Sequence, residues 1–139
     1  MINVAKIRTD GGTQIRAELN PLTVAEYAEA MASGETAFPP VTVFYDGTDH
    51  WLADGFHRVA AAREAGIAEI EAQIIPGSRR DAILHACGAN AAHGLRRTNE
   101  DKRRAVERVL RDDEWRQWSD REIARRCAVS HIFVAKVRA

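Results

Sequence analysis

Apolar and polar positions alternate along four short stretches in the first half of the chain, and this alternation predicts β-strands. The runs VTVFY (41–45) and HWLA (50–53) are joined by DGTD, a tight-turn sequence, so a hairpin is expected there. Single strands are expected over INVAKI (2–7) and over EIEAQII (69–75), the second of which ends at a Pro-Gly pair.

Two helices are predicted among these strands. Thr23 and Glu26 have the spacing of a capping box, which predicts a helix over about residues 24–31. A second helix is expected over about residues 56–65, because a glycine follows where its apolar pattern ends. Strands and helices therefore interleave over residues 1–78, and the predicted fold class of this part is α+β.

In the second half, apolar residues recur at helical spacing over residues 79–92 and 99–110, and Thr98 is placed to cap the later helix. The two tryptophans of the following EWRQW segment are interpreted as core residues. We therefore predict an α+β domain over residues 1–78, followed by an all-α domain over residues 79–139.

The segment 119–138 has the pattern of a helix-turn-helix. Ala128 stands where the turn usually has glycine, so we expect a left-handed residue or a slightly different turn. Ser130 is placed to cap the second helix. The predicted inward-facing residues are Ile123, Ala124, Cys127, Val129, Val134 and Val137. An ordinary helical hairpin is the alternative, but the number of matching positions favours DNA binding.

In the DNA-binding interpretation, the second helix of this segment enters the major groove of double-stranded DNA. Contacts to bases or phosphates are expected from Ser130, His131, Ile132 and Lys136, and contacts nearer the DNA backbone from Arg121, Arg125 and Arg126, with Arg138 completing the set. The sequence stops two residues after Val137, where native proteins seldom end, so a trimmed fragment is expected.

Composition and charge support this picture. The chain has 139 residues, of which 45% are apolar and 29% charged, as in globular proteins. Net charge is zero, but residues 1–78 carry 5 basic against 11 acidic residues, whereas residues 79–139 carry 15 against 9. The basic half suits a polyanion or is only a solvated helical surface. No signal peptide or membrane span is visible, so we expect a cytoplasmic protein with two reduced cysteines.

The most unusual stretch is WLADGFHRVAAAREAG (51–66), which places Gly55, His57 and Arg58 where a helix begins. The free N–H groups and the positive end of a helix favour phosphate, and a glycine there allows a ligand to approach closely. The alternative is that Asp54 caps the helix and that the basic side chains are ordinary surface residues.

This stretch resembles the signature of the ParB/sulfiredoxin superfamily, in which Gly-x-(Arg/His)-Arg-x-x-Ala at a helix start binds nucleotide phosphates. The resemblance extends along the chain in the family's order and ends in the helix-turn-helix. It implies a nucleotide- or phosphate-binding set comprising Gln14, Arg16, Gly55, Phe56, His57, Arg58, Asn90 and His93.

Two departures from the family pattern bear on chemistry. Sulfiredoxins need a cysteine at the position of Phe56, so no sulfiredoxin activity is expected. The Glu of the Glu-Asn-x-x-Arg motif is Ala89, which puts Mg²⁺ binding and hydrolysis in doubt. No metal site is expected from His85, Cys87 and His93, because no fourth ligand is suitably spaced.

The resemblance thus implies a ParB-like DNA-binding protein, acting in plasmid or chromosome partition or in transcriptional regulation. CTP or ATP is the implied ligand, and Mg²⁺ is left open. A homodimer would form through a segment beyond this sequence. The enzymatic alternative is a ParB-like nuclease or NTPase acting on DNA, for which two or three carboxylates around a metal are expected. We lean against catalysis and expect at most slow hydrolysis of CTP or ATP.

Overall fold

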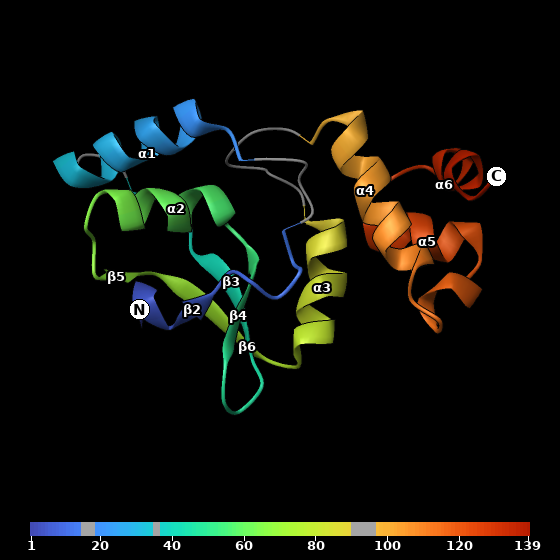
Figure 1. Ribbon diagram of the computed structural model, residues 1–139, viewed down its shortest axis with the longest axis horizontal. Coiled ribbons are helices and arrows are strands. Elements are labelled where there is room, and N and C mark those ends of the chain that lie inside the picture. The colour runs from blue at the N-terminus through green and yellow to red at the C-terminus, as the bar shows by residue number, and fades with distance from the viewer. Residues whose placement is uncertain (15–18, 35–36, 90–96) are drawn as a thin grey trace.

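The computed structural model describes residues 1–14, 19–34, 37–89 and 97–139. A half built on β-sheet and a half built of helices lie side by side, with helix α3 (Arg79–Gly88) between them (Figure 1). The N-terminus lies on the sheet half, and the C-terminus lies at the far end of the helical half. The predicted α+β class is confirmed.

The main sheet has four strands in the order β2-β4-β3-β6. β3 (Val41–Tyr45) and β4 (His50–Asp54) form the predicted antiparallel hairpin. β2 (Ile7–Arg8) lies parallel to β4, and β6 (Ala72–Pro76) lies parallel to β3. The hairpin turn is closed by the Asp46 carboxylate, which accepts backbone hydrogen bonds of 2.8 and 2.7 Å from two turn residues.

Side chains alternate along each strand, so both faces of the sheet carry apolar residues. Helices cover both of these faces. Val43 and Leu52 lie in one core beneath α2 (Phe56–Glu64). Phe44 and Trp51 point to the other face and pack in a cluster that includes a residue of α3. The sheet therefore fixes where α2 begins, because Gly55 alone separates the end of β4 from the first residue of α2.

Helix α1 (Pro21–Ser33) packs against α2 and begins earlier than predicted (Figure 1). Its N-cap is Asn20, whose side chain accepts a 3.1 Å hydrogen bond from the Thr23 N–H. Proline occupies the first turn, where its fixed φ suits the helix and its missing N–H costs nothing. The predicted capping box of Thr23 and Glu26 is therefore wrong, because Asn-Pro supplies a stronger start.

Two predicted strands are broken in the structure. INVAKI divides into β1 (Ile2–Asn3), a 3-10 turn η1 (Val4–Lys6) and β2. The Asn3 side chain accepts a 2.9 Å hydrogen bond from the Ala5 N–H, which turns the chain out of the extended conformation. EIEAQII divides into β5 (Glu69–Ile70), which pairs with β1, and β6, which pairs with β3.

The helical half consists of α4 (Asn99–Leu110), the short 3-10 helix η2 (Trp115–Gln117), α5 (Asp120–Cys127) and α6 (His131–Arg138). Thr98 caps α4 as predicted. One core holds the half together and also includes residues of α3. Its buried members are Ile83, Cys87, Ala105, Val106, Val109, Trp115, Ile123, Ala124, Cys127 and Val134. The prediction that the first tryptophan of EWRQW is a core residue is confirmed.

Helix α3 joins the two halves. Ala82 belongs to the sheet-side cluster, whereas Ile83 and Cys87 belong to the helical core. The predicted division between residues 78 and 79 falls at the N-cap of this helix, and it stays a prediction. Within the described ranges, none of the helices combines the length and the apolar content that crossing a lipid bilayer requires.

Candidate functional site

The helix-turn-helix segment is built by local caps and a strained turn. Ser119 and Ser130 each cap a helix by accepting a backbone hydrogen bond, at 3.2 Å for α5 and 3.1 Å for α6. Ala128 between them has φ 55° and ψ 48°, which is the left-handed conformation, the first of the two alternatives expected for this turn. Arg97 stabilises this turn from outside, since its guanidinium donates to the Ala128 carbonyl and to the Cys87 carbonyl, both at 3.1 Å.

The two faces of α6 differ. Val134 is fully buried in the helical core, and Val137 is half-buried, as predicted. His131, Ile132 and Lys136 are exposed, with 60% of Ile132 open to solvent. Within the part of the chain that the structure describes, neither the His131 nor the Lys136 side chain makes a hydrogen bond or an ion pair. The outer face of α6 is therefore available to a partner.

The arginines of the segment are not equally available. Glu122 receives hydrogen bonds from Arg125 at 2.6 and 3.0 Å and from Arg126 at 3.0 Å, and these contacts lower the pKa of its carboxyl to about 2. The Arg126 guanidinium also lies over the Trp118 ring, 4.9 Å from its centroid. Arg121 is exposed and makes no ion pair within the described residues.

The Arg138 side chain is hydrogen-bonded within the protein. Its guanidinium donates to the Asp120 carboxylate at 2.8 Å and to the carbonyls of Arg116 and Trp118, both at 3.0 Å. These bonds fasten the end of α6 to the beginning of α5. Of the residues predicted to contact DNA, Arg138 and the capping Ser130 thus have a structural task.

The Gly55 turn, residues 55–58, lies where α2 begins, as the sequence predicts. Gly55 is the N-cap of α2 at φ 106°, and a Cβ there would lie 2.5 Å from Val41 Cγ1. Only glycine fits both the conformation and the space. No side chain caps α2, so the alternative in which Asp54 caps this helix is wrong. Asp54 is instead the last residue of β4 and lies 3.7 Å from Arg58.

The basic side chains of this turn are occupied by the protein. His57 is buried, and its Nε2 accepts a 3.0 Å hydrogen bond from the Asn20 N–H, at the beginning of α1. Arg58 Nη1 donates to the carbonyls of Pro39 and Pro40 at 2.8 and 3.0 Å, just before β3. Both side chains fix neighbouring segments around α2. A phosphate at this turn would therefore be bound chiefly by backbone N–H groups.

Gln14 lies elsewhere, in a cleft of about 520 Å³ that none of the residues of the Gly55 turn lines. Its lining residues are Gly12, Gln14, Arg104, Glu107, Arg108 and Arg111. The three arginines are absent from the predicted sites, although their i, i+4, i+7 spacing places them on one face of α4. Three other members of the predicted phosphate-binding set, Arg16, Asn90 and His93, lie outside the described residues.

The described residues offer neither a cluster of metal ligands nor an exposed thiol. Among the described residues, no three His, Cys, Asp or Glu side chains come together as a metal-binding group. Both cysteines are free and buried. Burial raises the pKa of the Cys87 thiol to about 12 and that of the Cys127 thiol to about 11.

Comparison with solved structures identifies the architecture. The chain superimposes on C-terminally truncated ParB from Caulobacter crescentus, a chromosome-partitioning protein, complexed to the centromeric parS site, with a TM-score of 0.64 and 13% identity; 97% of this chain and 67% of that chain are covered. The chain has a ParB-like fold. The same protein complexed with CTP-γ-S gives a TM-score of 0.53 and 11% identity over 97% of this chain and 73% of that one.

Sequence relatives of this ParB-like chain are named regulators. It is 34% identical over 113 residues to the transcriptional regulator NovG of Streptomyces niveus, covering 81% of this chain and 34% of NovG. It is 29% identical over 113 residues to a possible regulatory protein of the streptomycin biosynthesis operon of Streptomyces griseus, covering 81% of this chain and 31% of that protein. The chain thus spans about a third of each relative. No family model matches it.

Proposed function

We propose that this chain is the DNA-binding part of a ParB-like regulator or partition protein. One observation carries the proposal: α6 buries one face in the helical core and exposes the other, where the His131 and Lys136 side chains are unpaired among the described residues. The ParB neighbour complexed to its parS site and the relatives named as regulators support the same use of the fold. Regulation of transcription is favoured over partition because the sequence relatives are regulators.

The proposed contacts follow from the exposed face. α6 has eight residues, and an α-helix with its side chains is ~10–12 Å across, which suits a major groove ~12 Å wide. His131 stands at the beginning of the helix and can exchange hydrogen bonds with base edges. Among the described residues, no partner pairs with the charge of Lys136 or Arg121, and both side chains are assigned to phosphates.

Duplex binding of the Lys136→Ala variant tests this assignment. Losing one phosphate contact should weaken binding to all sequences and reduce the slope of log affinity against log salt by about 1. Fluorescence anisotropy with duplexes at several salt concentrations measures both quantities. Lys6→Ala, an exposed lysine in η1, is the matched control and should leave the slope unchanged. Binding that does not depend on salt, or an equal effect of both substitutions, would contradict the proposal.

A second proposed function is CTP binding at the Gly55 turn. It is supported by the left-handed glycine, by the absence of a side-chain cap on α2, and by the CTP-γ-S complex of a ParB protein with the same fold. We expect backbone N–H groups of residues 56–58 to bind the phosphates. A CTP titration followed by amide NMR should shift these signals first. Unchanged signals at millimolar CTP would contradict the assignment.

A further inference from the structure

A cleft lies between the sheet half and the helical half, away from both sites proposed above. One wall is the loop 11–14, which two contacts hold in place. Thr13 is buried and its hydroxyl donates to the Leu52 carbonyl at 2.5 Å, while Arg79 donates to the Gly11 carbonyl at 3.1 Å. The opposite wall is one face of α4. The cleft, of about 520 Å³, is therefore bounded by two firmly anchored elements.

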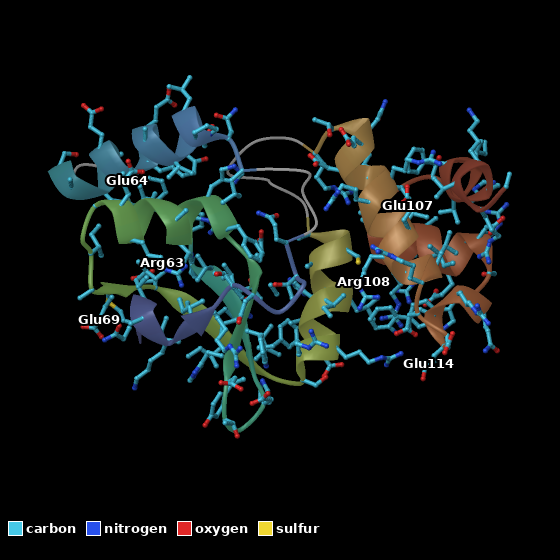
Figure 2. The ribbon with its side chains drawn as sticks, viewed as in Figure 1. Arg63, Glu64, Glu69, Glu107, Arg108 and Glu114 are labelled. Atoms are coloured by element: carbon cyan, nitrogen blue, oxygen red, sulfur yellow. The ribbon has the colours of Figure 1, made fainter. Side chains whose placement is uncertain are left out.

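The α4 wall is strongly cationic. It contributes Arg104, Arg108 and Arg111, against one carboxylate, that of Glu107. The Glu107 carboxylate is already engaged, because Arg103 Nε lies 2.9 Å from it. Arg111 is exposed and makes no ion pair within the described residues. Figure 2 labels Glu107 and Arg108, which both belong to α4.

Arg108 is held at the cleft by packing. Its guanidinium lies 5.8 Å from the centroid of the Trp115 ring, and Trp115 is buried in the helical core. A cation within about 6 Å of a ring centroid is attracted by the ring, so Trp115 favours a guanidinium position close to the helical core. The cleft therefore combines one guanidinium beside a buried ring with a more exposed one on the same helix face.

We propose that this cleft binds a small phosphorylated molecule, with its phosphates on Arg104, Arg108 and Arg111. Guanidinium groups match phosphate oxygens in geometry and charge. The volume lies within the range of ~300–1,000 Å³ that is usual for small ligands. Duplex DNA is disfavoured as the occupant. A duplex whose major groove alone is ~12 Å wide is too bulky to enter a cleft of about 520 Å³ that has protein on both sides.

The position of the cleft means that a ligand bound there would contact both halves of the protein. A polyphosphate between the loop 11–14 and α4 would connect the sheet half to the helical half. α4 in turn packs against α5 and α6, the helices of the proposed DNA-binding segment. The ligand would stabilise one relative placement of the two halves, whichever nucleotide the Gly55 turn binds.

Isothermal titration calorimetry with inorganic tripolyphosphate tests the proposal. The Arg104→Gln/Arg111→Gln variant should bind at least about tenfold more weakly, because charge-assisted hydrogen bonds are lost. Glu107→Gln should bind more tightly, because it removes the only carboxylate among the described lining residues. Lys6→Gln/Arg116→Gln removes the same two positive charges from exposed positions outside the cleft and is the control for the double arginine variant. In amide NMR of the wild-type protein, the Gly12 signal should shift on titration.

The outcomes distinguish a small phosphorylated ligand from the phosphates of duplex DNA. Opposite effects of the arginine and Glu107 variants support the cleft, and misfolding cannot produce the tighter binding. If tripolyphosphate affinity is unchanged while duplex DNA binding falls, the cleft belongs to the DNA surface and the proposal is wrong. Unchanged affinities for both also overturn it. Failure of CTP to shift residues 56–58 would reject the Gly55 proposal alone, since none of those residues lines the cleft.

Discussion

The outer face of α6 and the Gly55 turn both carry basic residues of a predicted binding motif, yet the protein uses them differently. His131 and Lys136 face solvent, and their side chains are unpaired within the described ranges. His57 and Arg58 are bonded to the backbone of segments 37 and 18–19 residues away. A basic residue in a binding motif is therefore available to a ligand only after its partners in the fold are known.

The same contrast occurs within α6 itself. Lys136 and Arg138 are both exposed basic residues near the end of the helix. Arg138 is fixed by three hydrogen bonds to residues before and at the beginning of α5, whereas Lys136 is unpaired among the described residues. Charge and position alone assign both residues to DNA, but hydrogen-bond partners separate them.

The largest loss of stability is expected from a substitution at Gly55. Gly55→Ala should destabilise the protein by about 2–5 kcal/mol, combining left-handed strain with overpacking against Val41. Gly34→Ala is the control, because Gly34 is also left-handed but nothing lies within 4 Å of an added Cβ. It should cost about 1–2 kcal/mol. Urea unfolding measures both, and equal losses would mean that the contact with Val41 imposes no constraint.

The next effect concerns Arg58. Arg58→Ala should destabilise the protein by roughly 2 kcal/mol or more without any nucleotide present, because two carbonyls lose a charged donor. Arg58→Lys should restore only part of this loss, since an ammonium lacks the planar fork. Arg121→Ala changes an exposed side chain that has no partner in the described ranges, so stability should change by less than about 0.5 kcal/mol. If Arg58→Ala is as stable as the wild type, the guanidinium belongs to the ligand site instead.

The smallest effect should come from Glu122→Gln, which would release Arg125 and Arg126. Duplex binding at low salt should strengthen, with a slightly steeper salt dependence. Glu71→Gln removes an equal charge from an exposed position in the sheet half and should have a weaker effect. If Glu122→Gln leaves DNA affinity unchanged, the two arginines do not contribute to the interface.

The same variant has a pH signature. Since the pKa of the Glu122 carboxyl is lowered from 4.5 to about 2, its contribution to stability is complete above the unfolded value and is lost as pH falls toward 2. The difference in urea midpoint between the wild type and Glu122→Gln should therefore shrink on acidification over this interval. A difference that does not depend on pH would contradict an ionised, paired Glu122.

Elements whose determinants are local could be predicted from sequence. The helix-turn-helix, its caps and the left-handed Ala128 depend on residues fewer than twenty positions apart, and all of these features are present. The hairpin and the helical core could equally be predicted, because turn residues indicate the hairpin and apolar spacing indicates the helical core. The broken strand at the N-terminus could not be predicted, since one hydrogen bond from the Ala5 N–H to the Asn3 side chain outweighs an alternating pattern of six residues.

The candidate sites were less predictable because distant segments complete them. The Asn20 N–H that occupies His57 and the carbonyls that occupy Arg58 become neighbours only through tertiary packing. Gln14 lines the cleft opposite α4, about ninety residues further along the chain. Helical spacing identifies the arginine face of α4, but nothing in the sequence indicates what faces it.

The buried thiols make this chain convenient for selective chemical labelling. Only the thiolate reacts with maleimides and similar reagents, and both native cysteines are buried with their pKa raised, to about 12 for Cys87 and about 11 for Cys127. A cysteine introduced at the exposed Ile132 would be the preferred target near neutral pH. A fluorophore there would report on the outer face of α6 without removing either native cysteine from the core.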